Sequence, residues 1–168
     1  MRLGVDEVGV TELMGVTEHT RAMATTAAAL LLDGLDTARP LIAPVESVAD
    51  GIIDEIAAWS ASALGSRAVP LLWRILAHNP HYLESTWRKE TAVMAAGALA
   101  AHDKRRVALG VAMSVRGRYM IEYTSAILRR AGDDDRDLLE ILGVVDHYTT
   151  LNTLSEGMQI ESDIRPPS

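Results

Sequence analysis

The sequence contains no cysteine among its 168 residues. This absence excludes disulfides, thiolate nucleophiles, cysteine-ligated zinc and iron–sulfur clusters. It also suits a protein of a reducing compartment, so we expect a cytoplasmic location. Phenylalanine is absent too, which leaves three tryptophans and four tyrosines as the large aromatic residues.

Positive charge is scarce: 16 lysines and arginines stand against 23 aspartates and glutamates, for a net charge of −7. Binding to nucleic acid or to an anionic membrane surface requires clustered basic residues, so we expect neither partner. The longest apolar run, residues 22–32, is shorter than the roughly 20 residues that span a bilayer. It predicts a buried helix.

The apolar residues recur with a helical period along nearly the whole chain. Val48, Ile52, Ile56 and Trp59, for example, share one helical face. No segment alternates as a β-strand does, so the predicted fold class is all-α. We expect helices over 11–32, 47–65, 69–80, 81–99, 101–115 and 118–132, with a last helix that carries Leu138, Leu142 and Val145 on one face.

Residues typical of helix ends support these boundaries. Gly65 and Gly132 suit the left-handed conformation that follows a helix, and Asn79-Pro80 stops the helix before it. Asp103 is the predicted N-cap of the 101–115 helix. The acidic stretch 133–135 favours the start of the last helix, because anions complement the helix dipole.

The segment 69–87 contains Pro70, Arg74, Leu76, Ala77, Asn79 and Pro80 in a pattern that resembles peroxidase-related proteins of the AhpD-like, carboxymuconolactone decarboxylase superfamily. The segments 103–115, 119–132 and 138–158 resemble the helices that follow in that family. The resemblance implies one AhpD-like domain of six or seven helices, with residues 41–165 as the family-like region and residues 1–40 as a helical extension. It also implies a homo-oligomer, from dimer to hexamer.

Redox members of this family carry a Cys-x-x-Cys pair, a histidine and a glutamate in a peroxidase relay. In this sequence the cysteine positions fall on Gly117 and Met120, and the histidine position falls on Thr124. The glutamate position falls on Arg105 or Arg106. Peroxide reduction by this relay needs a thiolate and a resolving thiol, so we expect no thiol-dependent peroxidase activity.

Other polar residues are candidates for different chemistry. We expect Asp146, His147 and Asn152 in the last helix to carry water activation or proton transfer, with Glu122 as a further acid or base. For each, a solvated surface position or a subunit contact is the alternative. The expected substrate-binding residues are Tyr119, Thr124, Arg116, Arg118 and Trp73. Trp59, Trp73 and Trp87 are expected to fill the core or a subunit interface, with the lining of a small apolar pocket as the alternative.

His78, His81 and Glu84 have a spacing that suggests a metal site. Asn79-Pro80 separates the two histidines, so they need not share a helical face, and we expect no metal and no cofactor. The resulting hypothesis is a non-redox enzyme of the proton-transfer, decarboxylation or hydrolysis type, acting on a small organic substrate. The alternative is a non-catalytic ligand-binding or scaffold protein.

Overall fold

The computed structural model describes residues 6–46 and 51–160, and within these ranges it contains seven helices and no β-strand. The predicted all-α class is therefore confirmed. The helices are α1 (Glu7–Ala29), α2 (Gly51–Ala63), α3 (Leu71–Leu76), α4 (Pro80–Met94), α5 (Ala101–Ser114), α6 (Arg118–Ala131) and α7 (Asp135–Gly157). None of the described helices is long and apolar enough to cross a membrane.

Several helix ends follow the local chemistry of the sequence. Asn79 caps α4, because its side chain accepts a hydrogen bond from the backbone nitrogen of Tyr82 at 3.1 Å. Gly132 ends α6 with a φ of 112°, the left-handed conformation that glycine adopts without strain. The prediction of Asp103 as an N-cap is wrong: Ala100 occupies the cap of α5, and Asp103 lies in the first turn, where its charge still complements the dipole.

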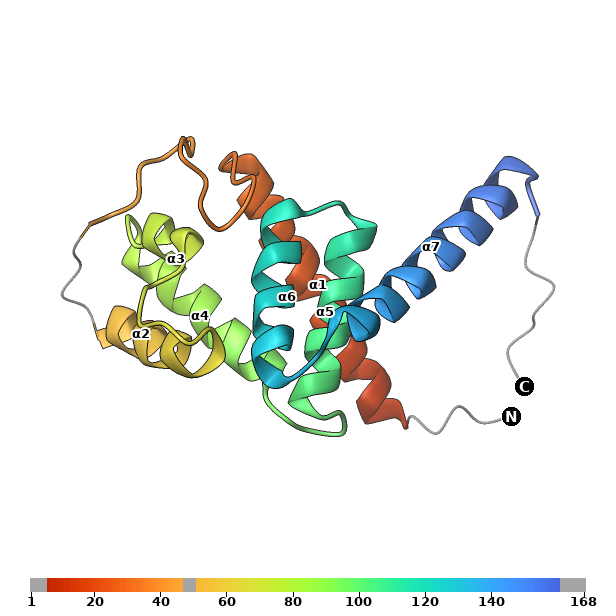
Figure 1. The fold of residues 1–168 in the computed structure, drawn as a ribbon, viewed down its shortest axis with the longest axis horizontal. Helices are drawn as coiled ribbons and strands as arrows, with labels where there is room; N and C mark the ends of the chain where they lie inside the picture. Colours follow the sequence, from red (N-terminus) through yellow and green to blue (C-terminus); the bar gives the residue numbers. More distant parts are fainter. Residues whose placement is uncertain (1–5, 47–50, 161–168) are drawn as a thin grey trace.

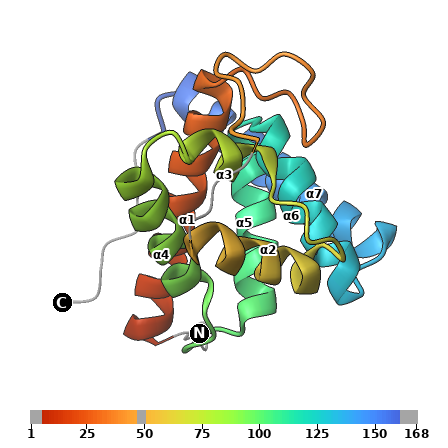
Figure 2. The same ribbon diagram turned by 90° about the vertical axis from the view of Figure 1, so that its left-hand side faces the viewer.

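Helix α1 lies at the centre of the fold (Figure 1). It packs against α4, α5 and α6, as Figures 1 and 2 show from two directions. Its closest approach to the α5–α6 turn is at Gly117, where an added Cβ would lie 2.7 Å from the Cβ of Ala24. The absence of a side chain at Gly117 thus allows α1 to sit against this turn.

Tryptophans form the middle of the core. Trp73 and Trp87 are fully buried, with ring centroids 5.3 Å apart in an edge-to-face arrangement. Each indole nitrogen has a partner: Trp87 donates to Glu55 at 2.9 Å, and Trp73 donates to the Tyr123 hydroxyl at 3.4 Å. Trp73 and Trp87 are therefore core residues, as one of the two sequence interpretations proposed.

Helix α7 packs only through its first turns. Ile141 and Val145 lie over Gly110 of α5. The absence of a side chain at Gly110 lets the two helices approach closely. Beyond this contact α7 leaves the body of the protein, as Figure 1 shows. None of its residues is buried, and it exposes Leu139, Leu142, Val144, Tyr148, Leu151, Leu154 and Met158.

Candidate functional site

The residues predicted for catalysis on α7 do not lie in an enclosed site. Asp146, His147 and Asn152 are all exposed on α7. In the single chain, Asp146 therefore has the solvated surface position that was the alternative to its catalytic role.

Glu122 anchors a loop and does not face a pocket. Its side chain is exposed, and its Oε2 accepts a hydrogen bond from the backbone nitrogen of Leu35 at 2.8 Å. The loop comes so close that a Cβ on Gly34 would lie 2.6 Å from Oε2. This contact gives Glu122 a structural role in holding the loop.

The five predicted substrate-binding residues divide into two groups. Arg116, Arg118 and Tyr119 border one small hollow of about 150 Å³ beside α1, and both arginines are exposed. Tyr119 is almost fully buried, its hydroxyl accepts a hydrogen bond from the nitrogen of Leu72 at 3.2 Å, and burial raises its pKa.

Thr124 and Trp73, in contrast, are fully buried. Trp73 packs in the tryptophan core, and the hydroxyl of Thr124 has no hydrogen-bond partner among the described residues. The structure therefore does not bring these two side chains to a surface where a substrate could reach them.

The positions of the family's redox relay are closed in this chain. Met120 and Thr124 are buried, and Gly117 packs against α1 too tightly to accept a side chain without movement. A cysteine at position 117 would meet Ala24. Gly117, Met120 and Thr124 therefore offer no thiol and no imidazole, and position 117 has no room for a side chain unless α1 moves.

A buried ionic cluster, here called the Glu90 triad, comprises His19 of α1, Glu90 of α4 and Arg105 of α5. Glu90 is 1% exposed; its Oε2 lies 2.7 Å from His19 Nε2, and its Oε1 lies 2.6 Å from an Arg105 nitrogen. Arg105 occupies one of the two positions where the resemblance places the relay glutamate. Glu90, on the neighbouring helix α4, supplies the negative charge that pairs with Arg105.

The environment of Glu90 keeps it ionised. Burial alone would raise the pKa of Glu90, but the Arg105 guanidinium and the His19 imidazole outweigh burial and hold the pKa at about 2. Tyr123 lies near this charge, and its pKa is raised by its own burial and by the Glu90 carboxylate. At neutral pH the triad therefore contains a carboxylate, and Tyr123 beside it keeps its proton.

The triad borders a larger hollow, here called the His102 pocket, of about 470 Å³ between α2, α4, α5 and α6. Its polar side chains include His102, Arg105 and Glu90, and Trp59, Ile127, Leu128 and Met94 are among its apolar residues. The Arg105 guanidinium lies 5.8 Å from the centre of the Trp59 ring, which favours the cation electrostatically. His102 and Arg105 stand one turn apart on α5 and reach the same space.

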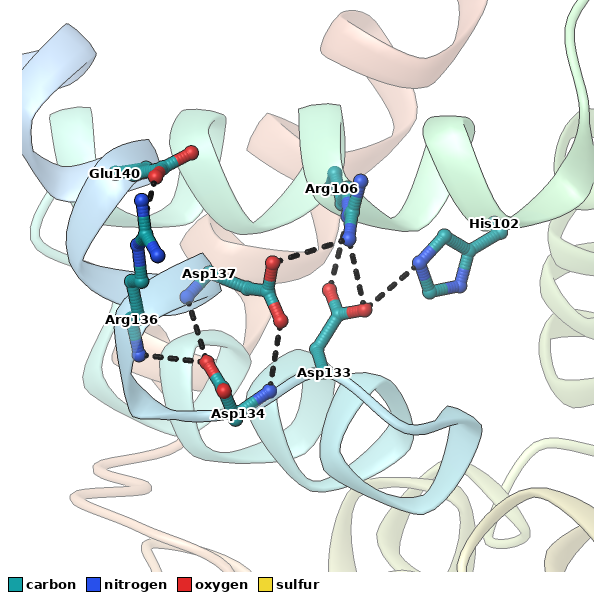
Figure 3. A network of polar contacts seen from close by, with 7 residues as sticks. All are labelled: His102, Arg106, Asp133, Asp134, Arg136, Asp137 and Glu140. Atoms are coloured by element: carbon teal, nitrogen blue, oxygen red, sulfur yellow. Dashed lines mark hydrogen bonds and ion pairs between the residues drawn. The ribbon is translucent and has the colours of Figure 1, made fainter.

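His102 is held by a carboxylate from the start of α7. Its Nε2 lies 2.9 Å from Asp133 Oδ1, and Arg106 binds both oxygens of Asp133 at 2.9 Å (Figure 3). The hydrogen bond from Arg106 lowers the pKa of Asp133, so this carboxylate is ionised at neutral pH. With Nε2 directed at Asp133, Nδ1 is the ring nitrogen of His102 that is left to contact a substrate.

The network in Figure 3 also explains why α7 starts where it does. Asp134 caps the helix, because its Oδ1 accepts from the nitrogens of Arg136 and Asp137 at 2.8 and 3.1 Å. Asp137 in return accepts from the nitrogen of Asp134 at 2.9 Å. The acidic stretch thus starts the helix, as predicted, and its first residue, Asp133, also orients His102.

Sequence reasoning missed the Glu90 triad, although a signal exists. On α4, Glu90 falls in the buried stripe of Leu83, Trp87 and Met94. His19 lies in the buried stripe of α1 in the same way, beside Val16 and Met23. A polar residue in an apolar stripe requires a buried partner, so the pattern indicates that His19 and Glu90 pair with each other.

The residues considered for a metal site have other roles or face solvent. His78 Nε2 lies 2.9 Å from the carbonyl oxygen of Ala43, and His81 and Glu84 are exposed. Within residues 6–46 and 51–160, no group of three or more histidine, aspartate or glutamate side chains is placed to hold a metal ion.

Comparison with known proteins identifies a similar structure. The chain matches the crystal structure of the alkylhydroperoxidase AhpD core from Rhodospirillum rubrum ATCC 11170 with 26% sequence identity and a TM-score of 0.59. The match covers 67% of this chain and 83% of that chain. No family model and no curated protein matches the sequence.

Proposed function

Because the chain has the all-α AhpD-like fold and no cysteine, we propose that it is a non-redox enzyme that transfers a proton on a small organic substrate in the His102 pocket. One observation carries the proposal: a histidine oriented by an ionised carboxylate and an arginine border the same largely apolar space. This pairing of a base with a cation suits removal of a proton beside a carbonyl group.

His102 is the proposed base. Its side chain is 37% exposed, which lets it exchange protons with solvent, and Asp133 fixes the ring through Nε2. The free Nδ1 has no protein partner among the described residues. An ionised aspartate in this place also stabilises the imidazolium that forms when His102 accepts a proton.

Arg105 is the proposed partner for substrate oxygen. Its charge is paired with Glu90 on one side, and its remaining donors lie at the lining of the pocket. A carbonyl or carboxylate oxygen can bind there, with the apolar part of the molecule against Trp59 and Ile127. We propose small oxo acids as the substrate class, because they combine these features.

Proton exchange tests this proposal without knowledge of the product. A panel of small 2-oxo and 3-oxo acids is incubated with the protein in D2O, and loss of the acidic C–H signal is followed by NMR. We expect catalysed exchange of at least one compound, reduced at least about 100-fold in His102→Gln. His81→Gln removes an exposed histidine outside the pocket and should exchange like the wild type. Equal exchange by His102→Gln would refute the assignment.

Non-catalytic ligand binding is the second candidate. It is favoured by the pairing of Arg105 with Glu90, which neutralises the charge at the pocket before any ligand arrives. Such a pocket suits an uncharged, largely apolar molecule. Binding of a compound without any exchange or turnover across the panel would support this alternative.

We also propose that the protein forms a homo-oligomer in which a second copy covers the exposed apolar stripe of α7. The exposed Val144, Tyr148, Leu151 and Met158 follow one another at three-, four- and seven-residue intervals, the spacing by which helices pair. A monomer would leave this stripe in water. Pairing of α7 with a second copy would bury it.

A further inference from the structure

Arg74 is a half-buried arginine that has no carboxylate partner among the described residues. Its Nε donates to the carbonyl oxygen of Val45 at 3.2 Å, and the nitrogen of Val45 donates back to the carbonyl oxygen of Arg74 at 3.2 Å. Its two terminal nitrogens have no hydrogen bond or ion pair with any described residue. A guanidinium that has left bulk water without a counter-ion favours binding of an anion.

Two hollows meet at this side chain, with volumes of about 490 and 270 Å³. Arg74, Ala68 and Val69 line both of them. The larger hollow, here called the Arg74 pocket, has apolar walls that include Leu64 of α2 and Leu71 of α3. It shares no lining residue with the His102 pocket.

The other polar groups of the Arg74 pocket are already engaged or exposed. The hydroxyl of Ser66 accepts from the nitrogen of Ala68 at 3.1 Å, and the hydroxyl of Thr37 donates to the carbonyl oxygen of Gly34 at 2.7 Å. Two carboxylates face the hollows, Asp36 in the larger and Glu46 in the smaller. Both are exposed, and neither lies within 4.0 Å of the guanidinium, so solvent screens them.

We propose that the Arg74 pocket binds a small organic carboxylate with an apolar body. The carboxylate would bind the terminal nitrogens of Arg74, and the body would lie along Leu64, Val69 and Leu71. A charge-assisted, bidentate contact of this kind supplies both affinity and orientation.

Three probes with the same six-carbon body test the charge requirement: hexanoate, hexanol and hexylamine. Titrations are followed by NMR on protein labelled at leucine and valine methyl groups. We expect hexanoate to shift the methyl signals of Leu64 and Val69 saturably and to bind at least about tenfold more tightly than hexanol or hexylamine. Equal binding of hexanol and hexanoate would overturn the proposal.

Variants distinguish a binding role of Arg74 from the structural role of its hydrogen bond to Val45. Arg74→Gln should weaken hexanoate at least about tenfold, and the nearby exposed Arg67→Gln should leave binding unchanged. Val69→Trp fills the pocket while Arg74 stays in place, and it should also abolish binding. Hexanoate binding that survives Val69→Trp, or that is lost in Ile127→Trp of the His102 pocket, would place the ligand elsewhere and overturn the proposal.

Discussion

Replacement of Glu90 by glutamine should strongly destabilise the protein. The substitution keeps the shape of the side chain but leaves Arg105, 11% exposed, without its counter-ion. Loss of one partner from a buried ion pair costs about 3–5 kcal/mol, because the remaining charge stays out of water. The exposed pair of Glu18 with Lys89 is the matched control, and Glu18→Gln should leave the free energy of unfolding nearly unchanged, because solvent screens this pair.

The same carboxylate predicts a pH dependence with a definite sign. The folded-state pKa of Glu90, about 2, lies below its ordinary value of 4.5, so ionised Glu90 stabilises the fold above about pH 4.5. This contribution is lost as the pH falls towards 2. At about 1.4 kcal/mol per pKa unit, it amounts to about 3 kcal/mol in total, of which about 2 kcal/mol is lost by pH 3.

Urea denaturation followed by circular dichroism at pH 7 and pH 3 measures both effects. The difference in unfolding free energy between the wild type and Glu90→Gln should be large at pH 7 and shrink by about 2 kcal/mol at pH 3. A difference below about 1 kcal/mol at pH 7 would show that the ion pair does not stabilise the fold. A difference that stays constant with pH would show that the pKa of Glu90 is not lowered.

Three further outcomes follow from the structure. Gly117→Ala should lower the free energy of unfolding by about 1–3 kcal/mol, since the new Cβ meets Ala24 at 2.7 Å; an unchanged melting temperature would contradict this contact. The wild type should reduce no alkyl hydroperoxide with a dithiol reductant beyond a heat-killed control, because it contains no cysteine. Light scattering should show an oligomer for the wild type and an 18.2 kDa monomer for the Val144→Glu, Leu151→Glu variant; a monomeric wild type would refute the covering of α7.

The helices were predictable because their signals are local. Apolar periodicity, Asn79-Pro80 and Gly132 each depend on residues within a turn or two, and the observed helices follow them closely. Asp103 is not the cap because α5 begins two residues earlier, at Ala101, with Ala100 in the cap position. A short polar side chain near a predicted start does not by itself decide which residue is the cap.

The site was less predictable because it depends on which helices meet. Nothing near Asp146 in the sequence indicates that α7 leaves the body of the protein and that none of its residues is buried. His102 gains its role only through Asp133, which is 31 residues away by their numbers and approaches through the α6–α7 turn. His19 and Glu90 each lie in an apolar stripe, and a polar side chain there requires a buried partner on another helix. This pattern could have predicted that the two residues pair.

Chemical rescue of His102 tests the proposed enzyme most directly. His102→Ala removes the base and leaves a space at an accessible edge of the pocket, where free imidazole can bind. With an oxo acid that the wild type exchanges in D2O, this variant should be inactive, and added imidazole should restore exchange saturably without accelerating the wild type. Full activity of His102→Ala, or inactivity that imidazole does not relieve, would contradict the assignment of His102 as the base.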